Sequence, residues 1–83
     1  MSNTTHTVEN GKFSVIVYNT TVLTINQDRI TLNSGGYRTN LTKNRINKYL
    51  PDDYRLYQEN HTWYVETPKG KVEFSDNMVI KMD

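Results

Sequence analysis

Basic and amide side chains follow a pair of glycines in the middle of the chain, and their chemistry suits contact with phosphate groups. From residue 29 to residue 50 the sequence contains no acidic residue, whereas the basic ones are Arg29, Arg38, Lys43, Arg45 and Lys48. The flanking segments are slightly acidic, so a whole-chain charge of +1 conceals this basic segment. Such a segment can neutralise nucleic-acid phosphates, and a neighbouring aromatic ring can stack on a base. The candidate binding residues are Tyr37, Arg38, Lys43, Asn44, Arg45 and Lys48.

The same residues have a simpler interpretation, namely a solvated helix face balanced by acidic residues elsewhere. The sequence pI of about 8.0 is far from the strongly basic profile of a dedicated nucleic-acid-binding domain. The sequence is compatible with both a binding surface and a solvated helix face.

Gly35 and Gly36 precede the expected start of a helix, where backbone amides can bind an anion. However, no Gly-Lys-Ser/Thr sequence follows them, and a third glycine of a dinucleotide-binding motif is missing. A strand-to-helix turn with positive φ at one of the two glycines is therefore the favoured interpretation.

The remaining residues do not assemble a catalytic or metal site. The chain has two histidines and no cysteine. Asp52 and Asp53 are neighbours in an expected turn, whereas a catalytic carboxylate pair faces across a cleft. We therefore expect no enzyme activity, no metal and no cofactor.

The composition and periodicity predict an α+β fold in which one helix packs on a mostly antiparallel sheet of six to seven short strands. The chain has no alanine and is rich in threonine and tyrosine, which favours sheet over helix. The expected order is β-β-β-α-β-β-β-β, with strands at 12–18, 21–25, 29–33, 54–58, 62–66, 71–74 and 78–82. Residues 1–11 are expected to be a flexible tail, and residues 12–83 a single domain.

The helix is predicted to begin after Thr39 or Asn40 and to end before Pro51. Its inner face would carry Leu41, Ile46, Tyr49 and Leu50, packed against residues such as Ile30, Leu32, Leu56 and Trp63. In the following strands, alternation separates Leu56 and Trp63 from Tyr57 and Tyr64, so one of these two sets should be core and the other an outward aromatic ladder.

Several of these motifs resemble a family of small uncharacterised proteins of tailed bacteriophages. The resemblance rests on Ser34-Gly35-Gly36-Tyr37-Arg38-Thr39, Thr42-Lys43 with Arg45-Ile46-Asn47, Tyr54 to Gln58, and Trp63-Tyr64-Val65. Many members have Trp where this chain has Tyr37 and Met where it has Ile46. The resemblance implies a phage origin and a location in the host cytoplasm, but it transfers no functional residue.

Two functions of different classes remain. One is a non-enzymatic accessory protein that binds nucleic acid through the basic turn and helix. The alternative is a stoichiometric inhibitor or adaptor of a host or phage protein, which binds through the same face or through the outward tyrosines. A virion or assembly component is a third. A membrane partner is not expected, because no segment approaches the length of an apolar span.

Overall fold

The protein is an α+β domain of eight strands and one helix, as seen in a computed structural model that describes residues 4–36 and 38–82. Four strands precede the helix and four follow it. In chain order the elements are β1 (Thr4–Glu9), β2 (Lys12–Val17), β3 (Thr20–Asn26), β4 (Arg29–Leu32), α1 (Asn40–Tyr49), β5 (Arg55–Glu59), β6 (Thr62–Thr67), β7 (Gly70–Glu73) and β8 (Met78–Lys81). The predicted fold class is therefore confirmed, with one strand more than expected.

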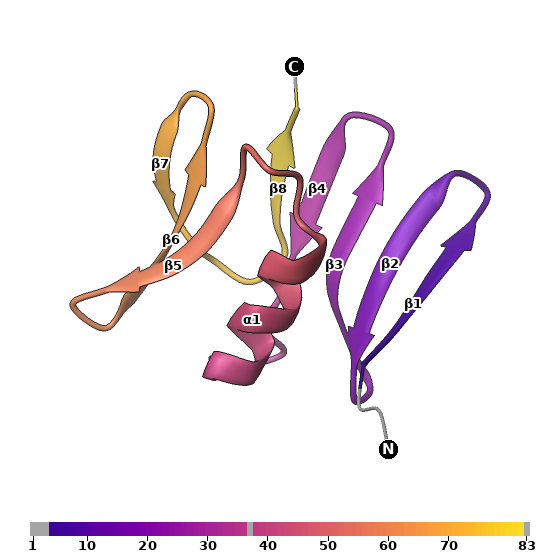
Figure 1. Cartoon of the computed structure of the whole chain (residues 1–83), viewed down its shortest axis with the longest axis horizontal. Helices are drawn as coiled ribbons and strands as arrows, with labels where there is room; N and C mark the ends of the chain where they lie inside the picture. The colour runs from indigo at the N-terminus through magenta and orange to yellow at the C-terminus, as the bar shows by residue number, and fades with distance from the viewer. Residues whose placement is uncertain (1–3, 37, 83) are drawn as a thin grey trace.

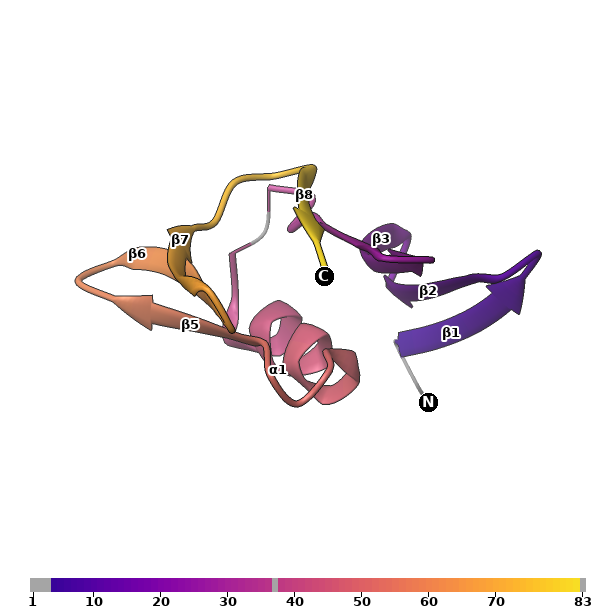
Figure 2. The ribbon, with the colours of Figure 1, turned by 90° about the horizontal axis from the view of Figure 1, so that it is seen from above.

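The strands form two antiparallel sheets that face each other across the core. The larger sheet has the order β1-β2-β3-β4-β8 and the smaller one the order β5-β6-β7. Seen from above, α1 lies between β5 and the β1–β2 end of the larger sheet (Figure 2). Figure 1 shows that β8 comes back beside β4 after the chain has passed through α1 and the smaller sheet.

The expectation of a flexible tail at residues 1–11 is wrong for the part that the structure describes. Thr4–Glu9 form β1, which pairs antiparallel with all of β2. Asn10 and Gly11 connect the two strands, and both have positive φ, which is the Asn-Gly hairpin turn that suits strand twist. The strand was missed because it is an exposed edge strand with little apolar alternation. Residues 1–3 lie outside the described residues.

The core is made by the facing sides of the two sheets and the inner side of α1. Its fully buried members come from both sheets and include Val15, Leu23, Ile30, Leu32, Leu56, Trp63 and Val65. In β3 the pairing with β2 skips Val22, so that Val22 and its neighbour Leu23 are both buried. This β-bulge explains why β3 lacks strict alternation of buried and exposed residues.

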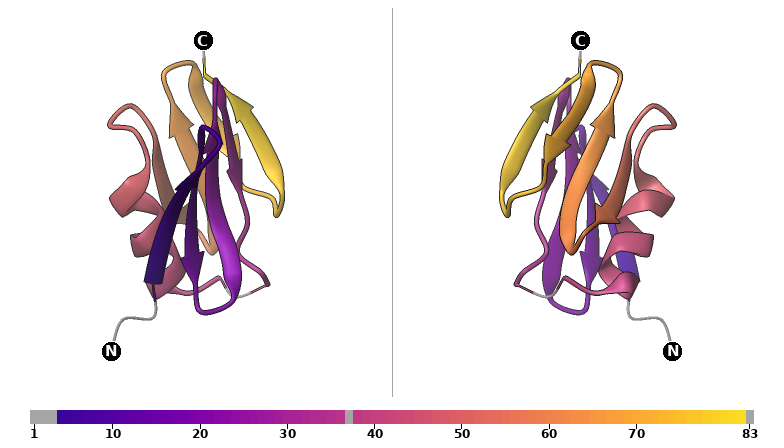
Figure 3. Two further views of the ribbon diagram at one scale, coloured as in Figure 1. Left: turned by 90° about the vertical axis from the view of Figure 1, so that its right-hand side faces the viewer. Right: turned by 90° about the vertical axis from the view of Figure 1, so that its left-hand side faces the viewer.

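The helix α1 begins and ends where its sequence predicts. Thr39 is the N-cap, and its side-chain oxygen accepts a hydrogen bond from the backbone N–H of Thr42. Leu50 is the C-cap, and Pro51 follows it. Ile46 is completely buried and Leu50 nearly so, which confirms the predicted inner face. Figure 3 shows α1 on one side of the molecule, beside β1 and β5.

Asn47 joins α1 to the open edge of β5. Its amide nitrogen donates to the carbonyl of Leu56 and its amide oxygen accepts from the N–H of Leu56, both at 2.7 Å. A strand edge without a neighbouring strand has backbone groups that need other partners. The side chain of Asn47 therefore does what a neighbouring strand would do, and it fixes the helix against the smaller sheet.

Candidate functional site

The structure divides the predicted basic residues between the two flanks of α1. Arg38 and Lys43 lie on the side of the smaller sheet. The guanidinium carbon of Arg38 is 5.1 Å from the ring centroid of Phe74, and the ammonium of Lys43 is 5.9 Å from that of Trp63. Because these rings belong to the core, both cations cover its edge through cation–π contacts. Tyr37 lies outside the described residues.

On the opposite flank, Arg45 faces the larger sheet, and Lys48 is exposed one turn later. The Nε of Arg45 donates to the hydroxyl of Thr4 at 2.8 Å, so that β1 contacts the helix directly. The ammonium of Lys48 is 5.6 Å from the ring centroid of Tyr49. Asn44, one turn before Lys48, is exposed. The predicted basic residues therefore do not form one cluster: Arg38 and Lys43 contact the smaller sheet, and Arg45 contacts the larger one.

The basic residues of α1 have no acidic neighbour at salt-bridge distance. The helix itself contains no acidic residue, and within residues 4–36 and 38–82 no carboxylate lies within 4 Å of Lys43, Arg45 or Lys48. Arg38 differs, because its charge helps to lower the pKa of Asp76. The three cations of α1 are therefore not neutralised by a carboxylate among the described residues, and the same holds for Lys12, Arg55 and Lys81 on other elements.

The two glycines form a turn that is closed by Asp76. Gly35 and Gly36 have φ values of +66° and +85°, which confirms the predicted positive φ. Asp76 accepts hydrogen bonds from the hydroxyl and the backbone N–H of the buried Ser34, at 2.6 and 2.9 Å. These hydrogen bonds, above all that from the hydroxyl, hold the pKa of Asp76 below its ordinary value. The amide of Gly36 donates to the Ser34 oxygen, so the turn uses its polar groups internally.

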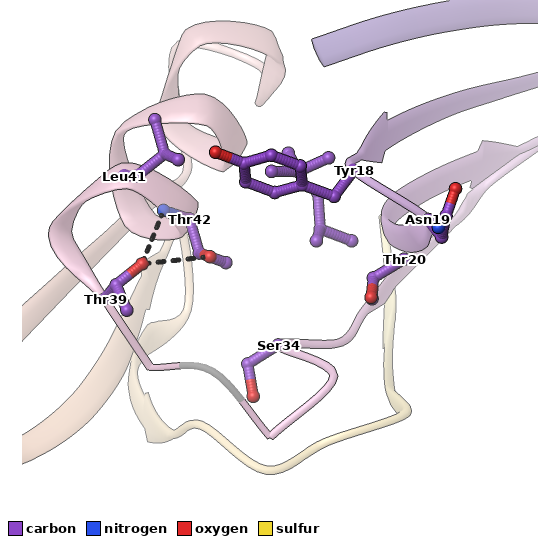
Figure 4. Close-up of a pocket in the computed structure, with 9 residues that line it drawn as sticks. Tyr18, Asn19, Thr20, Ser34, Thr39, Leu41 and Thr42 are labelled. Atoms are coloured by element: carbon purple, nitrogen blue, oxygen red, sulfur yellow. Dashed lines mark hydrogen bonds between the residues drawn. The ribbon is translucent and has the colours of Figure 1, made fainter. Parts of the chain in front are cut away.

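A pocket of about 600 Å³ opens between this turn, the turn after β2 and the first turn of α1 (Figure 4). None of its lining residues carries a charge. They are Val17, Tyr18, Asn19, Thr20, Val22, Ser34, Thr39, Leu41 and Thr42. Tyr18 extends its ring from the turn after β2 toward α1 (Figure 4), and the residue is 68% exposed. We call this the α1 pocket.

Three aromatic rings meet farther along the same flank of α1. The centroids of His6, Phe13 and Tyr49 lie 5.7 to 5.9 Å from one another, in tilted arrangements. His6 comes from β1, Phe13 from β2 and Tyr49 from the end of α1. We call this the ring cluster. Sequence reasoning missed it because His6 was assigned to a tail, and only the pairing of β1 with β2 brings its ring over the helix.

The outward tyrosines of the smaller sheet contact each other and a neighbouring lysine. Tyr57 and Tyr64 are directly paired across β5 and β6, with ring centroids 5.8 Å apart. The ammonium of Lys71 lies 4.6 Å from the centroid of Tyr64 and 3.4 Å from a carboxylate oxygen of Glu59. That carboxylate is the main reason why the pKa of Lys71 is raised. The expected separation of the two sets of aromatics is confirmed, with Trp63 buried and the tyrosines outside.

The matched family model spans residues 1–81 and is described as Kyanoviridae Gp96 protein. The chain belongs to this family. It is therefore a phage protein, as the resemblance implied, and the family description names no activity. Neither the curated proteins nor the solved structures include a match.

The part of the chain that the structure describes lacks two kinds of feature. Within it, no three His, Asp or Glu side chains come together closely enough to hold a metal ion. No helix there is long and apolar enough to cross a bilayer. The features that suit a ligand are thus the cations of α1, the α1 pocket and the ring cluster.

Proposed function

We propose that this phage protein is a non-enzymatic accessory protein that binds nucleic acid in the host cytoplasm through the exposed side of α1. One observation carries the proposal: the side chains of Lys43, Arg45 and Lys48 lack carboxylate partners among the described residues, on a helix without acidic residues. Binding of phosphates to such cations releases condensed counterions, which is the main source of affinity for a nucleic-acid backbone. The exposed amide of Asn44 adds a hydrogen-bonding group beside them.

Arg38 contributes less in this proposal than its sequence position suggested. Its guanidinium stacks over Phe74 and acts on Asp76, so part of its charge is already used within the protein. Lys43 has a 3.4 Å contact with the side-chain oxygen of Gln58, which a phosphate can replace, beside its cation–π contact with Trp63.

The salt dependence of binding tests the proposal. Three phosphate contacts on duplex DNA give a slope of about −2.7 for log affinity against log salt. Lys48→Gln is expected to bring the slope to about −1.8. Lys81→Gln removes the same charge from the exposed face of β8 and is expected to leave the slope unchanged. Fluorescence anisotropy with labelled DNA and RNA at low salt provides the measurement.

The competing function is inhibition or adaptation of a host or phage protein. It predicts no nucleic-acid binding at about 100 µM protein and low salt, a concentration at the weak end of non-specific affinities. It also predicts that a protein captured from host lysate stays bound after nuclease treatment. That pair of results would replace the nucleic-acid proposal by the protein-binding one.

A further inference from the structure

The flank of α1 that faces β1 and β2 carries a pocket, Arg45 and a cluster of rings, and Lys48 contacts one of those rings. The α1 pocket lies at the start of the helix beside Leu41, and the ring cluster lies at its end around Tyr49. A helix rises about 1.5 Å per residue, so these two points are about 12 Å apart along α1. Arg45 and Lys48 lie between them in the sequence of the helix.

Strand pairing brings Arg45 to the edge of the pocket. Thr4, which accepts the hydrogen bond of Arg45, is paired with Val17 across β1 and β2. Val17 is one of the pocket walls, and Tyr18 follows it directly. Only the Thr4–Val17 pair therefore lies between Arg45 and the pocket, so an anion bound to Arg45 would be close to a group inside it.

Tyr18 lies in the turn between β2 and β3 and, like Gln27 and His61 in other hairpin turns, has a left-handed backbone. Tyr18 has a φ of +55°, in the region that glycine and asparagine adopt easily and a bulky side chain does not. This conformation is unfavourable for a residue other than glycine. Asn19, the next residue, would suit the position better. The exposed ring of Tyr18 extends toward the pocket (Figure 4), where a flat group can stack on it.

The chemistry of the pocket suits a flat, uncharged group. Its walls are the side chains of Val17, Val22 and Leu41, and hydroxyl and amide groups line the rest. A volume of about 600 Å³ lies within the usual range for small-ligand sites. Because no charged residue lines it, the anionic part of a ligand must remain outside, where Arg45 is available.

We propose that the α1–β1 flank binds single-stranded nucleic acid, with one base stacked on Tyr18 in the α1 pocket. The proposal rests on the proposed function and names its substrate. The phosphates beside that base contact Arg45 and Lys48, and a neighbouring base lies against the ring cluster. A positively charged track with aromatic platforms is the general mode of single-strand binding. A base within a duplex is paired and stacked, so it cannot enter the pocket.

The acidic residues at the end of β1 and after α1 limit the length of the nucleic-acid strand that this flank can bind. Glu9 lies at the end of β1, and Asp52 and Asp53 follow the end of α1. These carboxylates would repel the phosphates of a nucleic-acid strand that continued beyond Tyr49. We expect a short single-stranded segment of DNA or RNA.

The decisive variant is Tyr18→Asn, because asparagine tolerates positive φ and removes only the ring. We expect roughly tenfold weaker binding of a single-stranded oligonucleotide, as for the loss of one stacked base. Binding of the corresponding duplex should change less than about twofold, since a paired base does not reach the pocket. Tyr57→Thr removes a tyrosine ring from the outer face of the smaller sheet and serves as the matched control. Urea unfolding should show that Tyr18→Asn is at least as stable as the natural chain.

Anisotropy with labelled single-stranded DNA, its RNA counterpart and the duplex separates the outcomes. The affinities for DNA and RNA show which of the two the protein prefers. If the natural chain binds none of them, the proposed function falls and this inference falls with it. If Lys48→Gln weakens binding but Tyr18→Asn does not, the proposed function stands and the pocket inference is overturned. A titration with adenosine and thymidine monophosphates, followed by NMR, gives an independent readout. Amide shifts at the pocket residues Asn19, Thr39 and Thr42, with or without shifts at Arg45 beside them, support the inference, and shifts that leave the pocket residues unchanged contradict it.

Discussion

Replacement of Asn47 by alanine should destabilise the protein far more than its partial exposure suggests. The substitution removes two hydrogen bonds of 2.7 Å and leaves both backbone groups of Leu56 without a partner. Leu56 is only 1% exposed, so water does not replace the lost amide easily. Two lost bonds to buried groups amount to about 3 kcal/mol. The higher helix propensity of alanine returns about 0.5 kcal/mol, which leaves a net loss of about 2.5 kcal/mol.

A domain of this size has a total stability of only about 4–12 kcal/mol, so the loss is a large fraction of it. Equilibrium urea unfolding followed by tryptophan fluorescence suits the measurement, since Trp63 lies in the core. With an m-value of about 1 kcal/mol/M, the midpoint should fall by about 2.5 M. Asn44→Ala is the matched control: it changes the same residue type on the exposed side of the same helix, and it should be neutral or slightly stabilising.

The reasoning about Asn47 is refuted if the two alanine variants unfold within about 0.5 kcal/mol of each other. Asn47→Asp separates the two hydrogen bonds, because aspartate still accepts from the N–H of Leu56 but places a carboxylate against its carbonyl. It should therefore be no more stable than the alanine variant. A stability equal to that of the natural chain would show that the amide nitrogen contributes nothing.

Three further predictions concern the core, the turn and pH. Ile46→Ala should lose about 2–5 kcal/mol in urea unfolding, because Ile46 is completely buried between α1 and the sheets; a loss below about 1 kcal/mol would contradict this packing. Gly35→Ala should be more destabilising than Gly36→Ala. A Cβ at Gly35 would lie 2.7 Å from the methyl group of Thr20, whereas a Cβ at Gly36 would have no other atom within 4 Å. Thr20→Ala should partly rescue the first variant and have no effect on the second, and equal thermal midpoints for the two glycine variants would count against this steric clash. Because the pKa of Asp76 is lowered on folding, its stabilisation is complete above the ordinary aspartate value of about 4 and is lost as the pH falls through the lower folded value. Asp76→Asn should therefore be less stable at neutral pH and should flatten the acid end of a stability–pH profile, whereas profiles of unchanged shape would show that the Ser34–Asp76 contact does not matter.

The parts of the fold that follow local rules are predictable from the sequence. Alternation of apolar residues indicated β2, β4, β5 and β6 within one or two residues, and Thr39 with Pro51 marked the ends of α1. The paired glycines gave the positive φ of their turn. The Asn10-Gly11 dipeptide was an equally local signal for the β1–β2 hairpin, but the polar residues before it concealed an edge strand.

What sequence could not show depends on how distant elements meet. The division of the strands into two sheets depends on how distant strands pair. The contact of Arg38 with Phe74 likewise joins the segment after the glycine turn to the residue that follows β7. Likewise, the strand expected at 12–18 ends at Val17, because Tyr18 turns with positive φ and joins the pocket. Of the candidate cations on α1, Lys48 is exposed whereas Lys43 and Arg45 are half-buried, and their separation onto two flanks follows from packing. The nucleic-acid role itself stays a prediction.

The pairing of β8 with β4 has a consequence for the order of folding. The strands β1 to β4 are connected by tight turns and can pair soon after they are made, since little chain must be closed. In contrast, β8 pairs with β4 only after the chain has closed the long loop that also joins Ser34 to Asp76, 42 residues apart. During synthesis the edge of β4 therefore stays open while α1 and the smaller sheet emerge. Mispairing between chains in concentrated refolding is expected to begin at this edge.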